Sequence, residues 1–442
     1  MTPRSPKDTI CINKWNWPIF KMHTKEFKTC CLTKFSPMDA SDPDFMNSQY
    51  QIDRRVDMMK GIRHPECNSC WKQEDLGAIS MRTSMMNEIL FSRQFKHKLL
   101  DEFGTDDLDE IADKVTPESS IVKFNNPKKV EFILGNQCDL HCVYCSRDSS
   151  SQWTLTDFRN KVITREQYKL ATTTTQTDDI NDAVWKWVDS DVKHTVQYIS
   201  ILGGEPLIMP EFYNTVTRLL EIFKNTENKP RLTILTNLNT PEKYFNKFLD
   251  YLPELSQCFD VIVSVSIESI YSKAEYIRSN LTWSIFEGNL DTLLAIGDNL
   301  CKVQLLPSIN ALSLSGTAEL LEWYFNKCYK FNRTIKLETN IIARPEFLSP
   351  YILPSSFSEF IDLAVTYLQN QATDTINYKY YCDYLLGIKP ALLADKPVDQ
   401  QIADKFIERI DMFDTRSNLK FADVFPEMQN FYTTCKRQHD KR

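Results

Sequence analysis

Residues Val130–Arg147 read VEFILGNQCDLHCVYCSR, and this stretch decides how the rest of the chain is interpreted. Its first part is an apolar run that ends at a Gly-Asn pair, which is typical of a buried strand followed by a turn. Cys138, Cys142 and Cys145 then follow in C-x3-C-x2-C spacing. Because closing so short a loop costs little conformational entropy, the three thiolates can converge without help from distant segments. The stretch therefore predicts a strand that leads into a site with three cysteines.

Three cysteines on one loop suit a metal cluster with one open position. A [4Fe–4S] cubane normally takes four cysteine ligands, so three ligands leave one iron free to bind another molecule. A structural zinc ion would need a fourth ligand, and the local candidate, His141, lies between two of the cysteines rather than at a usual zinc-finger spacing. A disulfide is disfavoured by the close spacing and by the lack of a secretion signal. We therefore favour an iron–sulfur cluster.

A second motif follows the next predicted strand, residues 195–202. It reads Gly203-Gly204-Glu205-Pro206, in a chain that has only ten glycines. Glycine lets a ligand approach the backbone closely, because no Cβ intervenes. A tight strand-to-helix turn closed by the proline is the alternative. The position of the motif, at the strand end that follows the cysteine loop, favours a ligand-binding role.

With these two motifs the chain resembles the radical S-adenosylmethionine (SAM) superfamily. The resemblance implies that Cys138, Cys142 and Cys145 hold a [4Fe–4S] cluster whose open iron chelates the methionine moiety of SAM. One electron then cleaves SAM to methionine and a 5′-deoxyadenosyl radical, which abstracts a hydrogen atom from the substrate. The protein supplies orientation and excludes water. An electron donor such as flavodoxin or ferredoxin is implied as a partner.

The resemblance also assigns further residues to SAM. Ser266 and Glu268 lie two apart at the end of a predicted strand, so their side chains leave the same face, and such groups suit ribose hydroxyls. The family more often has an aspartate where Glu268 stands. The guanidinium of Arg278 could bind a carboxylate through two parallel hydrogen bonds. A solvent-exposed arginine on a helix is the alternative. The implied SAM contacts are Tyr144 on the adenine, Gly203, Gly204 and Glu205 near the ammonium, Ser264, Ser266 and Glu268 on the ribose, Arg278 on the carboxylate, and Asn310, with Thr236 and Asn237, along the cavity.

Composition limits the class of protein. The chain has 442 residues, 42% apolar and 25% charged, which is ordinary for a globular protein with an ample core. Its net charge of −7 makes nucleic acid an unlikely partner. The polar N-terminus and the lack of a membrane-length apolar run predict a soluble protein of the reducing cytoplasm with no membrane partner. Neither common glycine-rich phosphate motif is present.

The order of predicted elements indicates an α/β fold. From residue 130 onward, apolar strands alternate with amphipathic helices, as in a parallel sheet whose ligands bind at the carboxyl ends of the strands. The resemblance implies a partial (β/α)6 TIM-like barrel over residues 130–350, preceded by a helical connector (91–129) and followed by a helical C-terminal extension (351–442). The predicted strands are 130–135, 195–202, 231–236, 259–266, 302–309 and 334–341, and the predicted core helices are 211–225, 241–252, 283–296 and 317–329.

Residues 1–90 form a separate cysteine-containing module in this prediction. Cys11, one of Cys30 and Cys31, Cys67 and Cys70 would make a set of four thiolates, suited to zinc or to an iron–sulfur cluster. Unligated buried thiols are the third alternative. The segment resembles a SPASM/twitch auxiliary-cluster module placed before the barrel instead of after it. That resemblance implies a second [4Fe–4S] cluster, with Cys30 rather than Cys31 as a ligand.

The leading functional hypothesis is a radical SAM enzyme that modifies a peptide or protein, because SPASM/twitch relatives often modify ribosomal peptides. Radical chemistry on a small metabolite, lipid or nucleotide sugar is the second hypothesis. A non-catalytic iron–sulfur or zinc protein is the third. The Gly-Gly-Glu-Pro motif and the ribose-like strand disfavour the third hypothesis, because an electron carrier needs no SAM cavity. No residue selects the substrate.

Overall fold

The structure, a computed structural model, describes residues 5–39, 44–75, 80–86, 89–123, 127–172, 178–371, 377–394, 397–416 and 418–440. The chain divides into two compact units. The first contains Met1–Gly135, Thr173–Leu202 and Asn214–Leu232, and the second contains Asn136–Thr172, Gly203–Tyr213 and Thr233–Arg442. This division cuts across the domain boundaries expected near residues 90, 130 and 350, which stay a prediction.

Strands of the first unit bring the N-terminal segment into a sheet. β1 (Pro18–Lys21) pairs in parallel with β4 (Lys129–Ile133), and β4 pairs in parallel with β6 (Tyr198–Leu202). On its other side β1 pairs antiparallel with β2 (Glu26–Thr29), which in turn pairs antiparallel with β3 (Ser36–Pro37). The N-terminal residues therefore add strands beside the one that leads to the cysteine loop.

Aromatic packing explains why the short strand β1 forms. Phe20 is completely buried, and its ring centroid lies 5.3 Å from that of Phe27, 6.0 Å from that of Phe132 and 5.5 Å from that of Trp187. Burying a phenylalanine side chain contributes about 3 kcal/mol, which is large for a strand of this length. Tertiary packing, rather than a local pattern, holds this strand in the sheet.

Helices of the first unit enclose a second core. Trp15 lies at its centre, with its ring edge-to-face on Phe95 and its indole N–H donating to the carbonyl of Ile121 at 2.5 Å. Arg55, fully buried, donates to the carbonyls of Lys14 and Val122. The described helices here are α1 (Asn13–Asn16), α2 (Gln49–Met59), α3 (Asn68–Asp75), α4 (Met81–Met86), α5 (Ile89–Phe103) and α6 (Leu108–Ile111), whereas α9 (Asp178–Trp187) packs on the strands through Trp185 and Trp187.

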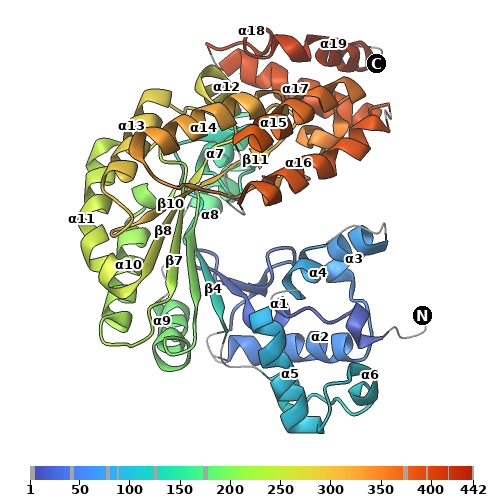
Figure 1. Ribbon diagram of the computed structural model, residues 1–442, viewed down its shortest axis with the longest axis vertical. Helices are drawn as coiled ribbons and strands as arrows, with labels where there is room; N and C mark the ends of the chain where they lie inside the picture. The colour runs from blue at the N-terminus through green and yellow to red at the C-terminus, as the bar shows by residue number, and fades with distance from the viewer. Residues whose placement is uncertain are drawn as a thin grey trace. The chain divides into compact units, whose positions relative to one another are not determined.

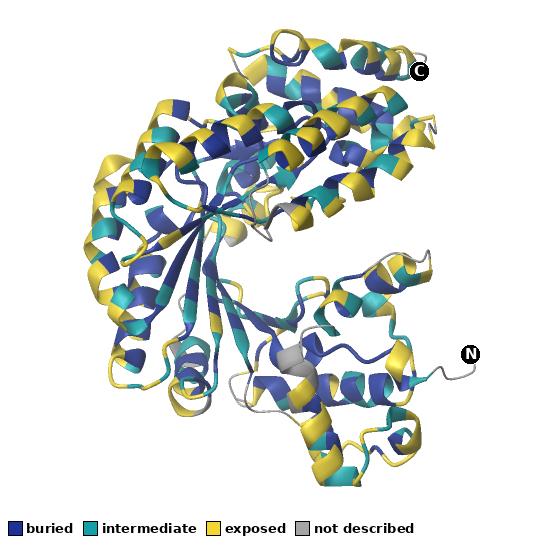
Figure 2. Ribbon diagram, viewed as in Figure 1, coloured by how far each residue is buried: buried dark blue, intermediate teal, exposed yellow. Residues whose placement is uncertain are grey.

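The second unit carries the later parallel strands and the helices that cover them. β8 (Asp260–Ser266) pairs in parallel with β10 (Lys302–Leu306), and β10 with β12 (Lys336–Leu337). α11 (Glu242–Cys258) and α13 (Trp283–Ala295) lie along the same side of β8 and β10 (Figure 1). Residues of these helices that face away from the strands are exposed, whereas most residues of the strands are buried or half-buried (Figure 2). The predicted α/β class with a mostly parallel sheet is confirmed, and it is consistent with the partial barrel.

Most other elements of the core differ from the predicted ranges only at their ends, but the strand expected over 334–341 is wrong, because β12 and β13 (Asn340–Ile341) are separate strands in different sheets. β7 (Arg231–Thr236) and α14 (Thr317–Phe331) begin where the sequence predicts, and α10 (Pro210–Phe223) differs by one residue at its start. The strand expected over 302–309 stops at Leu306, because Pro307 cannot donate to a ladder. Beyond that proline, β11 (Ser308–Ile309) pairs with β13 (Asn340–Ile341) as a separate sheet.

The C-terminal region is helical, as predicted. Its described helices are α15 (Ser358–Gln371), α16 (Asn377–Leu393), α17 (Gln400–Arg416), α18 (Phe421–Val424) and α19 (Gln429–His439). α17 packs on α19 through the edge-to-face rings of Phe406 and Phe431, 5.3 Å apart. Within the described part of the chain, no helix is both long and apolar enough to cross a membrane.

Candidate active site

The cysteine loop lies in the second unit and is tied to the segment that follows α12 (Tyr271–Ile277). β5 (His141–Cys142) pairs antiparallel with β9 (Arg278–Ser279), which places Cys142 opposite Arg278. The N–H of Val143 donates to the carbonyl of Ile277 at 2.8 Å. Cys138 and Cys142 are buried and Cys145 is half-buried. The loop is therefore held by backbone hydrogen bonds on both sides of its central cysteine.

The three thiols lie close enough to perturb one another. A hydrogen bond between Cys142 and Cys145 lowers the pKa of Cys142 and raises that of Cys145 well above its ordinary value. Burial, followed by the charge of Cys142, raises the pKa of Cys138. The sulfur of Cys138 also accepts from the N–H of Leu140 at 3.4 Å and from the amide of Asn237 at 3.9 Å. Such crowding of buried thiols fits a metal cluster, which binds them as thiolates.

The geometry of a single-ion site is not met. Among the described residues, no three His, Cys, Asp or Glu side chains form a group that could hold one metal ion. The ring of His141 lies against that of Trp153 at a tilt of 31°, with centroids 3.8 Å apart, and its Nε2 lies 3.2 Å from the hydroxyl of Thr156. Burial lowers the pKa of His141 to about 3. A cubane, unlike a single ion, places each thiolate on a different iron, so the three cysteines suit it without a histidine ligand.

The Gly203-Gly204-Glu205 turn packs directly against the start of the cysteine loop. A Cβ on Gly204 would lie 2.2 Å from the carbonyl oxygen of Gln137 and 2.6 Å from that of Asn136. The N–H of Glu205 donates to the same Gln137 carbonyl at 2.8 Å. Glycine is therefore required at position 204 for the contact of one backbone with another.

Glu205 joins this turn to the turn after β7. Its carboxylate is fully buried and accepts from the hydroxyl of Thr236 at 2.7 Å, from the N–H of Asn237 at 2.6 Å and from the N–H of Leu207 at 3.1 Å. Burial raises the pKa of Glu205 to about 7. These contacts favour a structural, supporting role for Glu205.

Asp139, which the sequence did not single out, connects the cysteine loop to the same turn. Its two carboxylate oxygens accept from the amides of Asn237 at 2.9 Å and Asn239 at 2.8 Å. The side-chain oxygen of Asn239 in turn accepts from the N–H of Thr282 at 2.9 Å. The sequence feature that could have indicated this connection is Asn237-Leu238-Asn239, which directly follows a predicted strand. Asn237, predicted to line the cavity, holds Asp139 instead.

Glu268 and Arg278, both assigned to SAM by the resemblance, pair with each other. Oε2 of Glu268 accepts from Nε of Arg278 at 2.9 Å and from Nη2 at 2.6 Å, and both residues are buried. Within the described residues, Oε1 of Glu268 has no hydrogen-bond partner. The guanidinium carbon of Arg278 also lies 5.8 Å from the ring centroid of the half-buried Tyr144. Since buried polar atoms are almost always paired, Oε1 is an acceptor suited to a bound ligand.

The remaining predicted SAM contacts lie in or just after strands. Ser264 is buried and accepts from the amide of Gln304 at 2.8 Å on the neighbouring strand. Ser266, half-buried, is the last residue of β8. Asn310 is buried and binds its own turn, donating to the carbonyl of Ser308 at 3.0 Å and accepting from the N–H of Leu312 at 2.9 Å. The structure therefore gives Ser264 and Asn310 partners within the protein.

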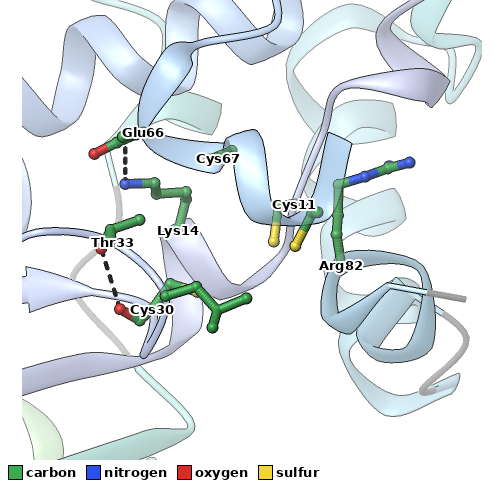
Figure 3. Close-up of a pocket in the computed structure, with 9 residues that line it drawn as sticks. Cys11, Lys14, Cys30, Thr33, Glu66, Cys67 and Arg82 are labelled. Atoms are coloured by element: carbon green, nitrogen blue, oxygen red, sulfur yellow. Dashed lines mark hydrogen bonds and ion pairs between the residues drawn. The ribbon is translucent and has the colours of Figure 1, made fainter. Parts of the chain in front are cut away.

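The N-terminal cysteines converge in the first unit. Cys11, Cys30, Cys67 and Cys70 line one pocket, and the first, second and fourth of these are buried (Figure 3). The thiol of Cys31 hydrogen bonds to Cys30, and Cys31 does not line this pocket. Of the two adjacent cysteines, Cys30 is therefore the one placed with the other three.

Positive side chains also line this pocket. Nζ of Lys14 lies 2.6 Å from Oε1 of Glu66, and both side chains are almost completely buried (Figure 3). Arg82, also buried, pairs with Glu74 at 2.6 Å. Each cation is thus paired with a carboxylate, so the surroundings of the four cysteines carry charges of both signs.

Residues 132–307 match the model of the Radical SAM superfamily, and this span includes the cysteine loop, the Gly-Gly-Glu-Pro turn and the Glu268–Arg278 pair. The matching superfamily implies a [4Fe–4S] cluster and SAM.

No curated protein matches the chain. Among solved structures, the chain is similar to one described as "Native anSMEcpe with bound AdoMet and Cp18Cys peptide", with 15% sequence identity and a TM-score of 0.36. The similarity covers 60% of this chain and 62% of that chain, so it spans less than two thirds of the known structure.

Proposed function

We propose that this enzyme uses a [4Fe–4S] cluster on Cys138, Cys142 and Cys145 to cleave SAM reductively, and that the product radical abstracts a hydrogen atom from a peptide or protein. The observation that carries the proposal is the crowding of three thiols on the loop of a radical SAM domain, with the Gly203-Gly204 turn packed against that loop. When bound, the cluster would supply the electron, and its open iron would hold SAM.

The surrounding residues bind and orient. Leu140 and Asn237 direct N–H groups at the sulfur of Cys138, and such bonds tune the potential of a cluster. Oε1 of Glu268 would accept a hydroxyl of the SAM ribose, with Ser266 beside it at the strand end. Arg278, held by Glu268, would present its remaining N–H groups and its charge to the SAM carboxylate.

We further infer that Cys11, Cys30, Cys67 and Cys70 hold an auxiliary [4Fe–4S] cluster, in a module of the SPASM/twitch type. Their convergence on one pocket supports this assignment, because four cysteine thiolates are the usual ligand set of a [4Fe–4S] cluster. Zinc, the other ion that the sequence left open for these thiolates, is disfavoured, because the described residues include no group of side chains that could hold a single metal ion. All 13 cysteines of the chain are described and are free thiols, which suits a reducing cytoplasm with a flavodoxin or ferredoxin as electron donor.

The proposed class of substrate is inferred from the N-terminal module of the SPASM/twitch type. Enzymes of the SPASM/twitch type often modify peptides, so a peptide or protein is the proposed substrate, with a small metabolite as the alternative. A short precursor peptide encoded beside this chain would be the first substrate to test. Deuterium transfer from the labelled peptide into 5′-deoxyadenosine is the expected result.

Electron paramagnetic resonance tests the proposed cofactor arrangement. Anaerobically reconstituted protein, reduced with dithionite, should give the signal of a [4Fe–4S]⁺ cluster, and added SAM should change that signal because it binds the open iron. The Cys142→Ala variant should lack the SAM-sensitive signal. A wild-type cluster whose signal does not respond to SAM would contradict the proposal.

A further inference from the structure

One face of α17 lies on the cysteine loop, although α17 belongs to the C-terminal extension. Arg409, Phe413 and Arg416 are spaced four and three residues apart, so they share this face. The guanidinium of Arg409 donates to the carbonyl oxygen of Val143, between the second and third cysteines. It also stacks on the ring of Trp153, with its central carbon 4.2 Å from the ring centroid.

The other two residues of this face extend the contact. The ring of Phe413 stacks on that of His141, with centroids 5.3 Å apart and planes 13° apart. Arg416 donates to the hydroxyl of Thr156 at 3.1 Å, and this hydroxyl is also the partner of His141. The histidine that the sequence offered as a zinc ligand is thus part of the contact between the loop and α17.

Arg409 completes the anchoring of the backbone around the central cysteine. The indole N–H of Trp153 donates to the carbonyl of Cys142 at 2.9 Å, and the next carbonyl, that of Val143, is bound by Arg409. The N–H of Val143 is bound by the carbonyl of Ile277. Two successive carbonyls are therefore held by two side chains that also stack on each other, which fixes the direction in which Cys142 and Cys145 leave the loop.

Arg409 also brings charge to this loop. Burial lowers its pKa only to about 10, so the guanidinium stays protonated at neutral pH, and Cys145 is one of the groups whose charge opposes that decrease. An iron–sulfur cluster becomes more negative when it is reduced. A fixed positive charge nearby therefore favours the reduced form, and the reduction potential rises.

We propose that Arg409 is a positioning residue for the catalytic cluster: it orders the cysteine loop through the Val143 carbonyl, and its charge raises the reduction potential of the cluster. This inference rests on the proposed function, since it requires a cluster on Cys138, Cys142 and Cys145. It assigns α17, a helix of the C-terminal extension, a role in electron transfer to SAM that the sequence of the helix does not indicate.

Three variants test it. Arg409→Gln removes the positive charge. Arg409→Lys keeps the charge but lacks the planar guanidinium that binds the Val143 carbonyl and stacks on Trp153. Lys405→Gln removes a charge from an exposed position of the same helix and is the control. The reduction potential of each reconstituted protein is measured by a redox titration monitored through the EPR signal that changes when SAM is added. The rate at which each protein loses iron to a chelator is measured separately. Circular dichroism checks the fold of each cluster-free protein.

We expect Arg409→Gln to have a more negative potential than wild type and to lose iron about 10-fold faster, as is usual when an outer contact of a metal site is removed. Arg409→Lys should keep a potential near that of wild type but lose iron faster, and Lys405→Gln should match wild type in both. Arg409→Gln with wild-type potential and wild-type iron loss would overturn the inference.

If Arg409→Gln does not fold, the Arg409→Lys variant tests the role of Arg409. Faster iron loss at an unchanged potential supports the inference, and wild-type iron loss overturns it. The two proposals remain distinguishable, because a wild-type protein that holds no SAM-sensitive cluster refutes the proposed function itself. A wild-type protein with such a cluster and an unaltered Arg409→Gln variant refutes only the role of Arg409.

Discussion

The N–H of Asn237 donates to Oε2 of Glu205 at 2.6 Å, so the turn after β7 is bound to the Gly-Gly-Glu-Pro turn through a buried carboxylate. Burial raises the pKa of this carboxyl to about 7, above the ordinary value of 4.5 that applies in the unfolded chain. Between these values the folded protein binds more protons than the unfolded chain does. The free energy of unfolding should therefore decrease as the pH rises through 7.

The test compares cluster-free wild type with Glu205→Gln in urea unfolding between pH 5 and pH 8. The difference between the two proteins isolates the contribution of Glu205 from that of other groups. We expect the wild type to lose on the order of 3 kcal/mol more than the variant over this range. Equal pH dependence in both proteins would show that Glu205 titrates normally.

Gly204 should tolerate no side chain. Gly204→Ala places a methyl group 2.2 Å from the Gln137 carbonyl oxygen, a backbone atom that cannot move without displacing the cysteine loop. We expect destabilisation of about 3 kcal/mol and a lower iron content after reconstitution. The control is Gly288→Ala in α13, where a methyl group would meet nothing within 4 Å and should stabilise the helix by up to about 1 kcal/mol. Equal iron content in both variants would contradict the contact.

The Glu268–Arg278 pair should be costly to break on one side only. Glu268→Leu leaves the buried guanidinium of Arg278 without its partner and should destabilise the protein by about 4 kcal/mol. The double variant Glu268→Leu/Arg278→Leu should be much less destabilised than the sum of the two single variants. Chemical unfolding of the four proteins gives the coupling energy, and additive effects would show that the pair is not formed.

The two adjacent cysteines should differ in the N-terminal site. Cys30 lines the pocket with Cys11, Cys67 and Cys70, whereas Cys31 does not. After reconstitution, Cys30→Ala should therefore lose metal from this site and Cys31→Ala should keep it. Loss of about four irons per chain would identify a [4Fe–4S] cluster, whereas loss of zinc at unchanged iron would identify a structural zinc site. Unchanged metal in both variants would mean that these thiols are unligated.

Much of the fold follows from local pattern, because the core strands and helices carry strong apolar periodicity. The strand predicted at 231–236 has the observed bounds of β7. The strands of the N-terminal segment were not predicted, since β1 has only four residues and depends on the aromatic side chains packed around Phe20. Short strands of this kind leave no periodic signal.

The candidate site likewise contains residues that could be predicted from local sequence and residues that could not. The cysteine loop could be predicted because its members lie within a few residues of one another. The partners of Glu205 come from the end of another strand, so its supporting role could not be read from the motif alone. Arg409 lies 266 residues from Val143, and nothing near it in sequence indicates what it contacts.

The measurement that tests the central claim most directly is the reductive cleavage of SAM. Reconstituted wild-type protein, incubated anaerobically with SAM and dithionite, should form 5′-deoxyadenosine and methionine. The triple variant in which Cys138, Cys142 and Cys145 are alanine should form neither above the level of a protein-free control, while its N-terminal site keeps its metal. Equal formation of 5′-deoxyadenosine by the two proteins would contradict the assignment of the catalytic cluster to this loop.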